Sequence, residues 1–407
     1  MLSWLAPIVV FGLVVLVHEL GHFLAAKAMG VYAPRFSIGF GPALFRRRWG
    51  ETEYVLGALP LGGYVRMASR DDETMALIEG GGERAPREPN TVGGSGGAKV
   101  GEEHIADGMR PQEWDPDALV PFGPRPVPEH RWFESKRLPA RLVILLAGVA
   151  MNIALTFVVL VGAYASFGQP YLLPVVDSVV AGMPAAAAGI QPGDSIVAVD
   201  GAPVARWSEV VERVTASAGD TLALELRRAG DPVTLRLVPA LAADTNAMTG
   251  EVRSVGRIGA AVDVNRTGTD PISLGGAVSQ GAATTWDMGT LVFTTLRRLA
   301  SGSESVSSLG GPIAIAQISV EAARTGPENF VFLLALISIN IGIFNLLPIP
   351  ILDGGQIVVN VAEAVKGRPF SVRTKEMIAR VGLAAIGLLF VVVMFNDIKR
   401  LLQSLLG

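Results

Sequence analysis

Residues 5–26 read LAPIVVFGLVVLVHELGHFLAA, an apolar run that is long enough to cross a lipid bilayer and yet contains two histidines and a glutamate. Residues 18–22 of this run, HELGH, follow the pattern H-E-x-x-H. Positions i and i+4 share one face of a helix, so His18 and His22 can bind one metal ion while Glu19 accepts a proton from a water molecule on that ion. Because burying such groups in a membrane segment is costly, we predict a functional metal site on a transmembrane helix.

The composition indicates a membrane protein with a water-exposed part. Of the 407 residues, 50% are hydrophobic and 17% are charged, and the mean hydropathy is positive. The net charge of -3 gives no sign of nucleic-acid binding. The sequence has no cysteine, which excludes disulfides and cysteine-ligated zinc.

Four apolar segments are long enough to cross a bilayer when tilt is allowed for. They are residues 5–26, 142–167, 330–347 and 378–395. The first segment lacks the charged start of a secretory signal peptide, and its removal would discard the H-E-x-x-H pattern. We therefore expect it to be retained as a membrane span.

The third span runs into Pro348 and Pro350, which cannot both lie in a regular helix. Irregular backbone at membrane depth must be surrounded by protein or by a water-filled cavity, which places a site near Asp353. A catalytic zinc ion needs three protein ligands. The other histidines fall in a polar loop, the second span has no carboxylate and Asp397 lies at the far end of the fourth, so Asp353 is the remaining candidate. Without a metal ion, Asp353 would be a helix cap or a turn residue.

Three asparagines in the apolar spans are further candidate site residues. Asn340 and Asn345 precede Asp353, and Asn152 lies in the second span. Hydrogen bonding between helices is the simpler interpretation of each asparagine. In the functional interpretation, Asn345 holds the substrate backbone or the oxyanion of a tetrahedral intermediate.

The connections between the spans differ in character. Residues 53–67 form short extended pieces, and residues 68–131 are rich in glycine, proline and charge, which is typical of a solvated and partly disordered loop. Residues 173–239 alternate short β-like runs with turns, as expected of a compact soluble domain. Residues 277–300 are amphipathic and either lie at a membrane interface or pack as an ordinary helix.

Basic residues are concentrated in three of the connections, and the positive-inside rule makes these connections cytoplasmic. The soluble domain and both termini are then expected on the other side of the membrane, although Lys399 and Arg400 weakly oppose this orientation. The basic residues are Arg35, Arg46, Arg47, Arg48, Arg131, Lys136, Arg137, Arg141, Lys366, Arg368, Arg373, Lys375 and Arg380.

Six motifs together resemble a known family. They are HELGHF (18–23), SIGFGP (37–42), LPLGGYVRM (59–67), AGVAMNIAL (147–155), SINIGIFNLLPIPILDGG (338–355) and FNDIKRL (395–401). In this order, they resemble the site-2 protease family of intramembrane zinc metalloproteases, in particular the bacterial regulator-of-sigma-E protease group. Residues 179–201, VVAGMPAAAAGIQPGDSIVAVDG, are similar to the helix–turn–strand signature of bacterial protease PDZ domains. The resemblance covers nearly the whole chain except the loop 68–131.

The resemblance implies a protease of the bacterial inner membrane that cuts peptide bonds within the transmembrane segments of single-span proteins. Its substrates would be anti-sigma factors already trimmed by another protease, or signal-peptide remnants. One zinc ion per chain would be held by His18, His22 and Asp353, with Glu19 as the catalytic base. The unwound substrate would pair with a membrane-associated β-hairpin that contains residues 59–67. The expected substrate-binding residues are Asn345, Pro348, Pro350, Asn340, Asn152, Gly62, Gly63 and Tyr64.

We therefore expect a polytopic α-helical membrane protein with about four transmembrane helices, a membrane-associated β-hairpin and one inserted α+β PDZ-like domain. The active site is expected toward the cytoplasmic side. The PDZ-like domain would bind a peptide tail or only restrict access. The expected parts are 1–67 (first span and hairpin), 68–131 (cytoplasmic loop), 132–170 (second span), 171–265 (extracytoplasmic PDZ-like domain), 266–327 (amphipathic helical connector), 328–365 (third span with N-x-x-P-x-P-x-L-D-G-G) and 366–407 (cytoplasmic loop and fourth span).

The chain departs from the family pattern in two ways. The best-known members carry tandem PDZ domains, whereas only one is recognised here, and the loop 68–131 is longer than usual. The main alternative function is a catalytically silent membrane scaffold that binds peptide tails, but a scaffold gains nothing from charged groups in lipid. A metal transporter would need a series of polar sites across the membrane, which the sequence lacks.

Overall fold

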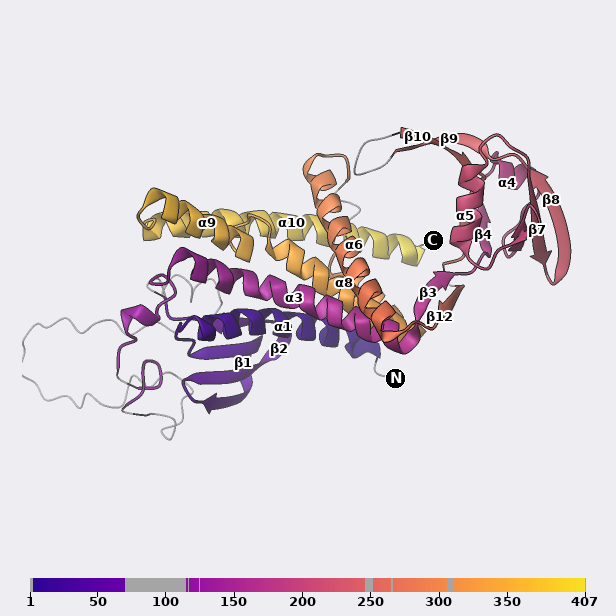
Figure 1. The fold of residues 1–407 in the computed structure, drawn as a ribbon. Helices are drawn as coiled ribbons and strands as arrows, with labels where there is room; N and C mark the ends of the chain where they lie inside the picture. Colours follow the sequence, from indigo (N-terminus) through magenta and orange to yellow (C-terminus); the bar gives the residue numbers. More distant parts are fainter. Residues whose placement is uncertain are drawn as a thin grey trace, which may run out of the picture. The chain divides into compact units, whose positions relative to one another are not determined.

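The computed structural model describes residues 3–69, 115, 117–123, 125–245, 252–264, 266–305 and 310–406 (Figure 1). Most of the predicted loop 68–131 lies outside these residues. The chain divides into two compact units, one made of Met1–Ala163 with Val278–Gly407 and the other of Tyr164–Ala277. The second unit contains the predicted domain 171–265 and extends beyond it at both ends.

Four helices of the first unit are long and apolar enough to cross a membrane, as the sequence predicts. A helix satisfies its own backbone hydrogen bonds, which lipid cannot do for it. Of the most apolar stretch of the last helix, only 11% is buried inside the protein, so most of its side chains are available to lipid. The helices are α1 (Ala6–Ala28, after the short 3-10 helix η1, Ser3–Leu5), α3 (Leu138–Phe167, after η3, Glu129–Arg131), α8 (Pro327–Asn345) and α10 (Val372–Leu406).

Helix α1 packs against both α3 and α8 in the interior of this unit. At Gly21, α1 comes into backbone contact with α3, because a Cβ atom at position 21 would lie 2.4 Å from the carbonyl oxygen of Ala147. This contact requires glycine and places α3 directly beside the H-E-x-x-H turn. The buried apolar residues between α1 and α8 are Val10, Val14, Leu333, Leu334 and Ile337.

The backbone leaves the helical conformation between α8 and α9 (Asp353–Lys366), where the two prolines predict a break. Asp353 is the first residue of α9, so it occupies a helix start. The break is tightly folded around two glycines. A Cβ atom at Gly354 would lie 2.1 Å from the carbonyl oxygen of Leu346, and one at Gly355 would lie 2.0 Å from that of Ile349.

Strands β1 (Arg35–Trp49) and β2 (Thr52–Arg66) form a long antiparallel hairpin beside α1 (Figure 1). Both strands change register along their length. Arg35 lies opposite both Glu53 and Arg66, and Ile38 lies opposite both Leu56 and Gly63. The first part of β1 is therefore the centre of a small sheet, and the last part of β2 lies at its edge.

Two further helices of this region are α6 (Leu274–Ala300) and α7 (Pro312–Thr325). Helix α6 exposes Trp286 and Phe293, in keeping with the predicted amphipathic character. The N-terminus of α7 is capped by Asp397 of α10, which is buried and accepts backbone hydrogen bonds from Gly311, Ile313 and Ala314. The carboxylate at the far end of the fourth span therefore caps a helix.

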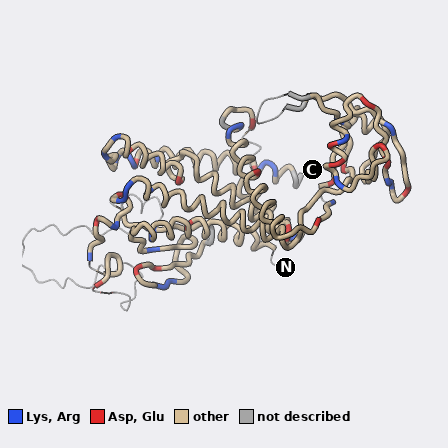
Figure 2. Tube along the Cα trace, viewed as in Figure 1, with Lys and Arg blue, Asp and Glu red and all other residues tan. Residues whose placement is uncertain are grey.

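Charged side chains join the start of α3 to the end of α9 and the start of α10, where Figure 2 shows several basic residues. Arg141 of α3 donates to Asn360 of α9 at 2.8 Å. Glu363 of α9 is buried and lies 4.0 Å from Arg141 and 3.5 Å from Lys375 of α10. These contacts hold in place the helix that begins at Asp353.

The second unit has its own core of buried aliphatic side chains, including Ile196, Leu224 and Leu226. Strands β6-β5-β7-β8 form an antiparallel sheet, and the other strands pair as β4 with β11, β3 with β12 and β9 with β10. The elements are β3 (Gln169–Leu172), β4 (Val176–Val179), α4 (Pro184–Ala187), β5 (Ser195–Val199), β6 (Ala202–Pro203), α5 (Trp207–Ala216), β7 (Leu222–Arg228), β8 (Asp231–Leu237), β9 (Ala240–Thr245), β10 (Val252–Arg257), β11 (Ala260–Val262) and β12 (Thr267–Asp270).

Candidate metal centre

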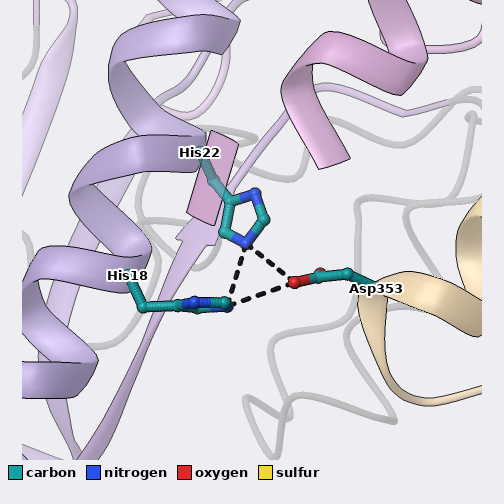
Figure 3. A group of neighbouring side chains, drawn as sticks. All are labelled: His18, His22 and Asp353. Atoms are coloured by element: carbon teal, nitrogen blue, oxygen red, sulfur yellow. Dashed lines mark hydrogen bonds and ion pairs between the residues drawn. The ribbon is translucent and has the colours of Figure 1, made fainter. Parts of the chain in front are cut away.

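Two helices bring the three predicted ligands together (Figure 3). His18 and His22 project from one face of α1, and Asp353 projects from the first turn of α9. The Nε2 atoms of the two histidines are 3.2 Å apart and lie 3.2 Å and 3.3 Å from Oδ2 of Asp353. Both histidines are buried. Within the described part of the chain, no other group of three or more such side chains is clustered for metal binding.

The triangle of ligand atoms has the size that a tetrahedral zinc ion requires. Zinc–nitrogen and zinc–oxygen bonds of roughly 2.0–2.1 Å place the ligand atoms of a tetrahedral site about 3.3 Å apart. Oδ2 of Asp353 is buried and has no hydrogen-bond partner among the described residues, which is costly unless a cation lies beside it. Two imidazoles and one carboxylate also form a common ligand set of catalytic zinc, with a fourth position open to water. The residues present therefore fit zinc.

Helix α3 lines the outer side of the two histidines. Nδ1 of His22 lies 2.8 Å from the backbone carbonyl oxygen of Ile144, so it donates to that oxygen and leaves Nε2 free to bind a metal ion. Nδ1 of His18 lies 3.4 Å from the side-chain amide of Asn152. Between these two contacts lies Gly148, where a Cβ atom would be 2.4 Å from Nε2 of His22 and 2.8 Å from Cε1 of His18.

The side chain of Glu19 lies beside strand β2 of the hairpin. Glu19 follows His18 on α1 and is half-buried. A Cβ atom at Gly63 of β2 would lie 3.3 Å from Cγ of Glu19 and 2.7 Å from the carbonyl oxygen of Ser37. The absence of a side chain at Gly63 therefore lets the edge of the hairpin approach the expected general base.

The neighbouring residues Gly62 and Tyr64 pack around one aromatic ring. Gly62 has a φ of +118° and leaves room for Phe40, whose Cε2 atom would lie 2.1 Å from a Cβ atom at this position. The rings of Phe40 and Tyr64 are stacked, with centroids 6.4 Å apart. These contacts hold the end of β2 against β1 within the hairpin.

Of the residues predicted around the broken third span, Asn345 lies nearest to the metal ligands. Its Nδ2 atom is 3.3 Å from Nε2 of His18. Pro348 is exposed, whereas Pro350 packs against Gly382 of α10, where a Cβ atom would be 2.9 Å from the proline ring. The amide of Asn340 donates instead to the carbonyl oxygen of Leu336 in its own helix.

Sequence reasoning missed the contribution of Ile144 and Gly148. Ile144 acts through its backbone carbonyl, which no residue type reveals. Ile144 and Gly148 precede Asn152 by two helical turns and one, so their spacing does place all three on the same face of a helix. The sequence does not show that this face turns toward the histidines, because nearly all side chains of α3 are apolar and no hydrophobic stripe marks its rotation.

Comparisons with known proteins point to one family. The family model described as peptidase family M50 matches residues 6–389. The zinc metalloprotease RasP of Geobacillus kaustophilus is 32% identical to this chain, over 98% of both proteins. The regulator of sigma-W protease RasP of Bacillus subtilis is 30% identical, over 98% of both. A putative zinc metalloprotease of Mesorhizobium japonicum is 35% identical, over 96% of both.

Proposed function

Because this chain belongs to peptidase family M50 and is an intramembrane zinc metalloprotease of the site-2 type, we propose that Glu19 is its general base and that His18, His22 and Asp353 hold the zinc ion. The observation that carries these assignments is the triangle of 3.2, 3.2 and 3.3 Å between the three ligand atoms. It joins a membrane-length helix to the start of α9, more than three hundred residues later in the chain.

Glu19 and Asn345 have separate roles in the proposed hydrolysis of the peptide bond. A bound zinc ion supplies Lewis acidity and an acidified water molecule. Glu19 accepts the proton of the attacking water and passes it to the leaving amine. The amide of Asn345, next to His18, is placed to donate to the substrate carbonyl oxygen as negative charge develops on it.

We propose that the substrate is a transmembrane segment that unwinds and pairs with the end of β2. A helical substrate hides its carbonyl groups in its own hydrogen bonds, and lipid offers no replacement for bonds that are broken. The residues Gly62, Gly63 and Tyr64 lie at a sheet edge that can supply them. Gly63 adjoins Glu19, so a paired substrate would pass beside the base.

We assign Asn345, Pro348 and Pro350 to the other wall of this substrate cleft. The prolines cannot donate backbone hydrogen bonds, which keeps this segment irregular and exposes its polar groups to a substrate. We do not assign Asn340 and Asn152 to the cleft, because Asn340 is bonded within its helix and Asn152 is 0% exposed.

The name of the Bacillus relative, a regulator of sigma-W protease, supports membrane-bound anti-sigma factors as a substrate class for this chain, and signal-peptide remnants share the required single-span form. We propose the bacterial inner membrane as its location, with the active site toward the cytoplasm and the second unit and both termini outside. The basic residues near the start of α3 and between α9 and α10 support this orientation.

We propose that the second unit is a PDZ-like domain that binds a peptide tail or restricts access to the active site. Strand β11 supports this proposal, because it pairs with β4 and, among the described residues, with no other strand. An unpaired strand edge is what a PDZ domain offers to a peptide. Binding of a tail would select substrates that have already been shortened outside the membrane.

The test is cleavage of a purified single-span substrate in detergent, together with measurement of bound zinc. Glu19→Gln should lower the cleavage rate by at least about a hundredfold and keep its zinc, because the base is lost and the ligands are not. His22→Ala and Asp353→Ala should lose zinc. Glu225→Gln, an exposed change in the second unit, is the matched control. Equal cleavage by wild type and Glu19→Gln, or unchanged zinc in both ligand variants, would refute the assignments.

A further inference from the structure

The two ligand histidines each have a second ring nitrogen, and both of these nitrogens face α3. A neutral imidazole that binds a metal ion through Nε2 carries its proton on Nδ1, which needs an acceptor. For His22 the acceptor is the carbonyl oxygen of Ile144 at 2.8 Å. For His18 the neighbour is the side-chain amide of Asn152, whose Nδ2 atom lies 3.4 Å from Nδ1.

The amide of Asn152 is buried and only partly satisfied in this orientation. Asn152 is 0% exposed, and its Oδ1 atom has no hydrogen-bond partner among the described residues. The oxygen and nitrogen of an asparagine amide have nearly the same shape and are assigned from the hydrogen-bond network. Reversing the amide places Oδ1 against Nδ1–H of His18, so that this acceptor and this donor become partners of one another.

The surroundings of Asn152 fix where its side chain can lie. Its backbone carbonyl oxygen accepts hydrogen bonds from Ser338 at 2.8 Å and from Thr156 at 2.9 Å. Its Cβ atom packs against Gly342 of α8, where an added Cβ atom would be 3.2 Å away. The amide is therefore confined between α1, α3 and α8, with His18 as its neighbour.

We propose that Asn152 is a positioning residue whose side-chain oxygen accepts the Nδ1 proton of His18 and so directs Nε2 of that histidine to the zinc ion. One face of α3 then orients both histidines through acceptors at positions 144 and 152, and Gly148 leaves room for the rings between them. This inference rests on the proposed function, since it requires that His18 holds zinc. Loss of an outer partner of this kind typically weakens metal binding by about 10–100-fold.

The experiment measures the zinc affinity of the purified full-length protein in detergent, without substrate, by competition with a chromophoric chelator. Asn152→Leu removes the acceptor at similar size and should weaken zinc binding by about 10–100-fold. Asn152→Asp keeps an acceptor oxygen and cannot donate, so it should bind zinc about as tightly as wild type. Asn340→Leu is the matched control, because the amide of Asn340 is bonded within its own helix.

Several results would overturn the inference. One is a zinc affinity of Asn152→Leu equal to that of wild type. This result would overturn the role proposed for Asn152 but not the assignment of the protein as a protease, even if the variant no longer cleaved substrate. Another is a loss of zinc affinity in Asn152→Asp as large as the loss in Asn152→Leu. That result would mean that the side chain of Asn152 acts as a hydrogen-bond donor or only fills space. The Asp variant decides the question even if the Leu variant does not fold. A wild-type protein that binds no zinc would overturn both the inference and the proposed metal centre.

Discussion

Replacing Gly148 with alanine tests whether the two histidines must approach α3 as closely as the structure shows. The added methyl group would point at the metal ligands. Its carbon would lie 2.4 Å from Nε2 of His22 and 2.8 Å from Cε1 of His18, whereas ordinary contact begins at 3.4 Å. The ring of His22 would therefore have to retreat by about 1 Å.

A displacement of this size is too large for a zinc site, where ligand distances are held to within roughly 0.2 Å. The ring of His22 is also tied to Ile144 by its hydrogen bond of 2.8 Å, so it cannot move without losing that bond. Separating α1 from α3 would instead break their contact at Gly21. Overpacking of this kind costs about 1–3 kcal/mol. We expect zinc affinity to fall by about a hundredfold, which corresponds to roughly 2.7 kcal/mol.

The assay compares Gly148→Ala with Gly162→Ala in the same helix. A Cβ atom at Gly162 meets nothing within 4 Å, so this control shares the gain in helix propensity of about 1 kcal/mol without the clash. Zinc affinity and substrate cleavage are measured for both proteins in detergent. The control should match wild type in both measurements. Full zinc binding and cleavage by Gly148→Ala would show that the close approach of α3 is not required.

Three further predictions concern the contacts that hold the site and the second unit. Glu363→Gln should lower the free energy of unfolding by about 2 kcal/mol, because the buried carboxylate lies between two cations, and an unchanged unfolding temperature would contradict this. Hydrogen bonds from Arg131 lower the pKa of Glu51, in the turn between β1 and β2, from 4.5 to about 2. The stabilisation that this ion pair gives the turn is therefore fully present above pH 4.5 and is lost as the pH falls through about 2. Hydrogen exchange at the turn, corrected for intrinsic rates, should be constant above pH 4.5 and faster below it. Asp194→Asn should destabilise the second unit by about 2 kcal/mol, as measured by pulse proteolysis, because the carboxylate accepts charge-assisted hydrogen bonds from Arg228 at 2.9 and 2.8 Å; equal proteolysis of both proteins would refute it.

The sequence alone was sufficient to predict the four membrane-length helices and the three side chains that the structure brings together as a candidate metal site. An apolar run of that length is helical in a bilayer because only internal hydrogen bonds can satisfy its backbone. The spacing of His18 and His22 places them on one face of such a helix. Elimination led to Asp353, because the apolar spans contain so few carboxylates and because the adjacent prolines predict the break that the structure shows.

Only the tertiary structure decided which side of α3 faces the histidines. Nearly all side chains of α3 are apolar, so it has no hydrophobic stripe from which its rotation can be predicted. The rotation is set by the backbone contact between Gly21 and Ala147, a pair of small residues far apart in the sequence. The same contact brings the carbonyl of Ile144, the gap at Gly148 and the amide of Asn152 against the two ligands. Residue identity predicted the three side chains that cluster as a candidate metal site, and the packing of one helix against another determined how they are oriented.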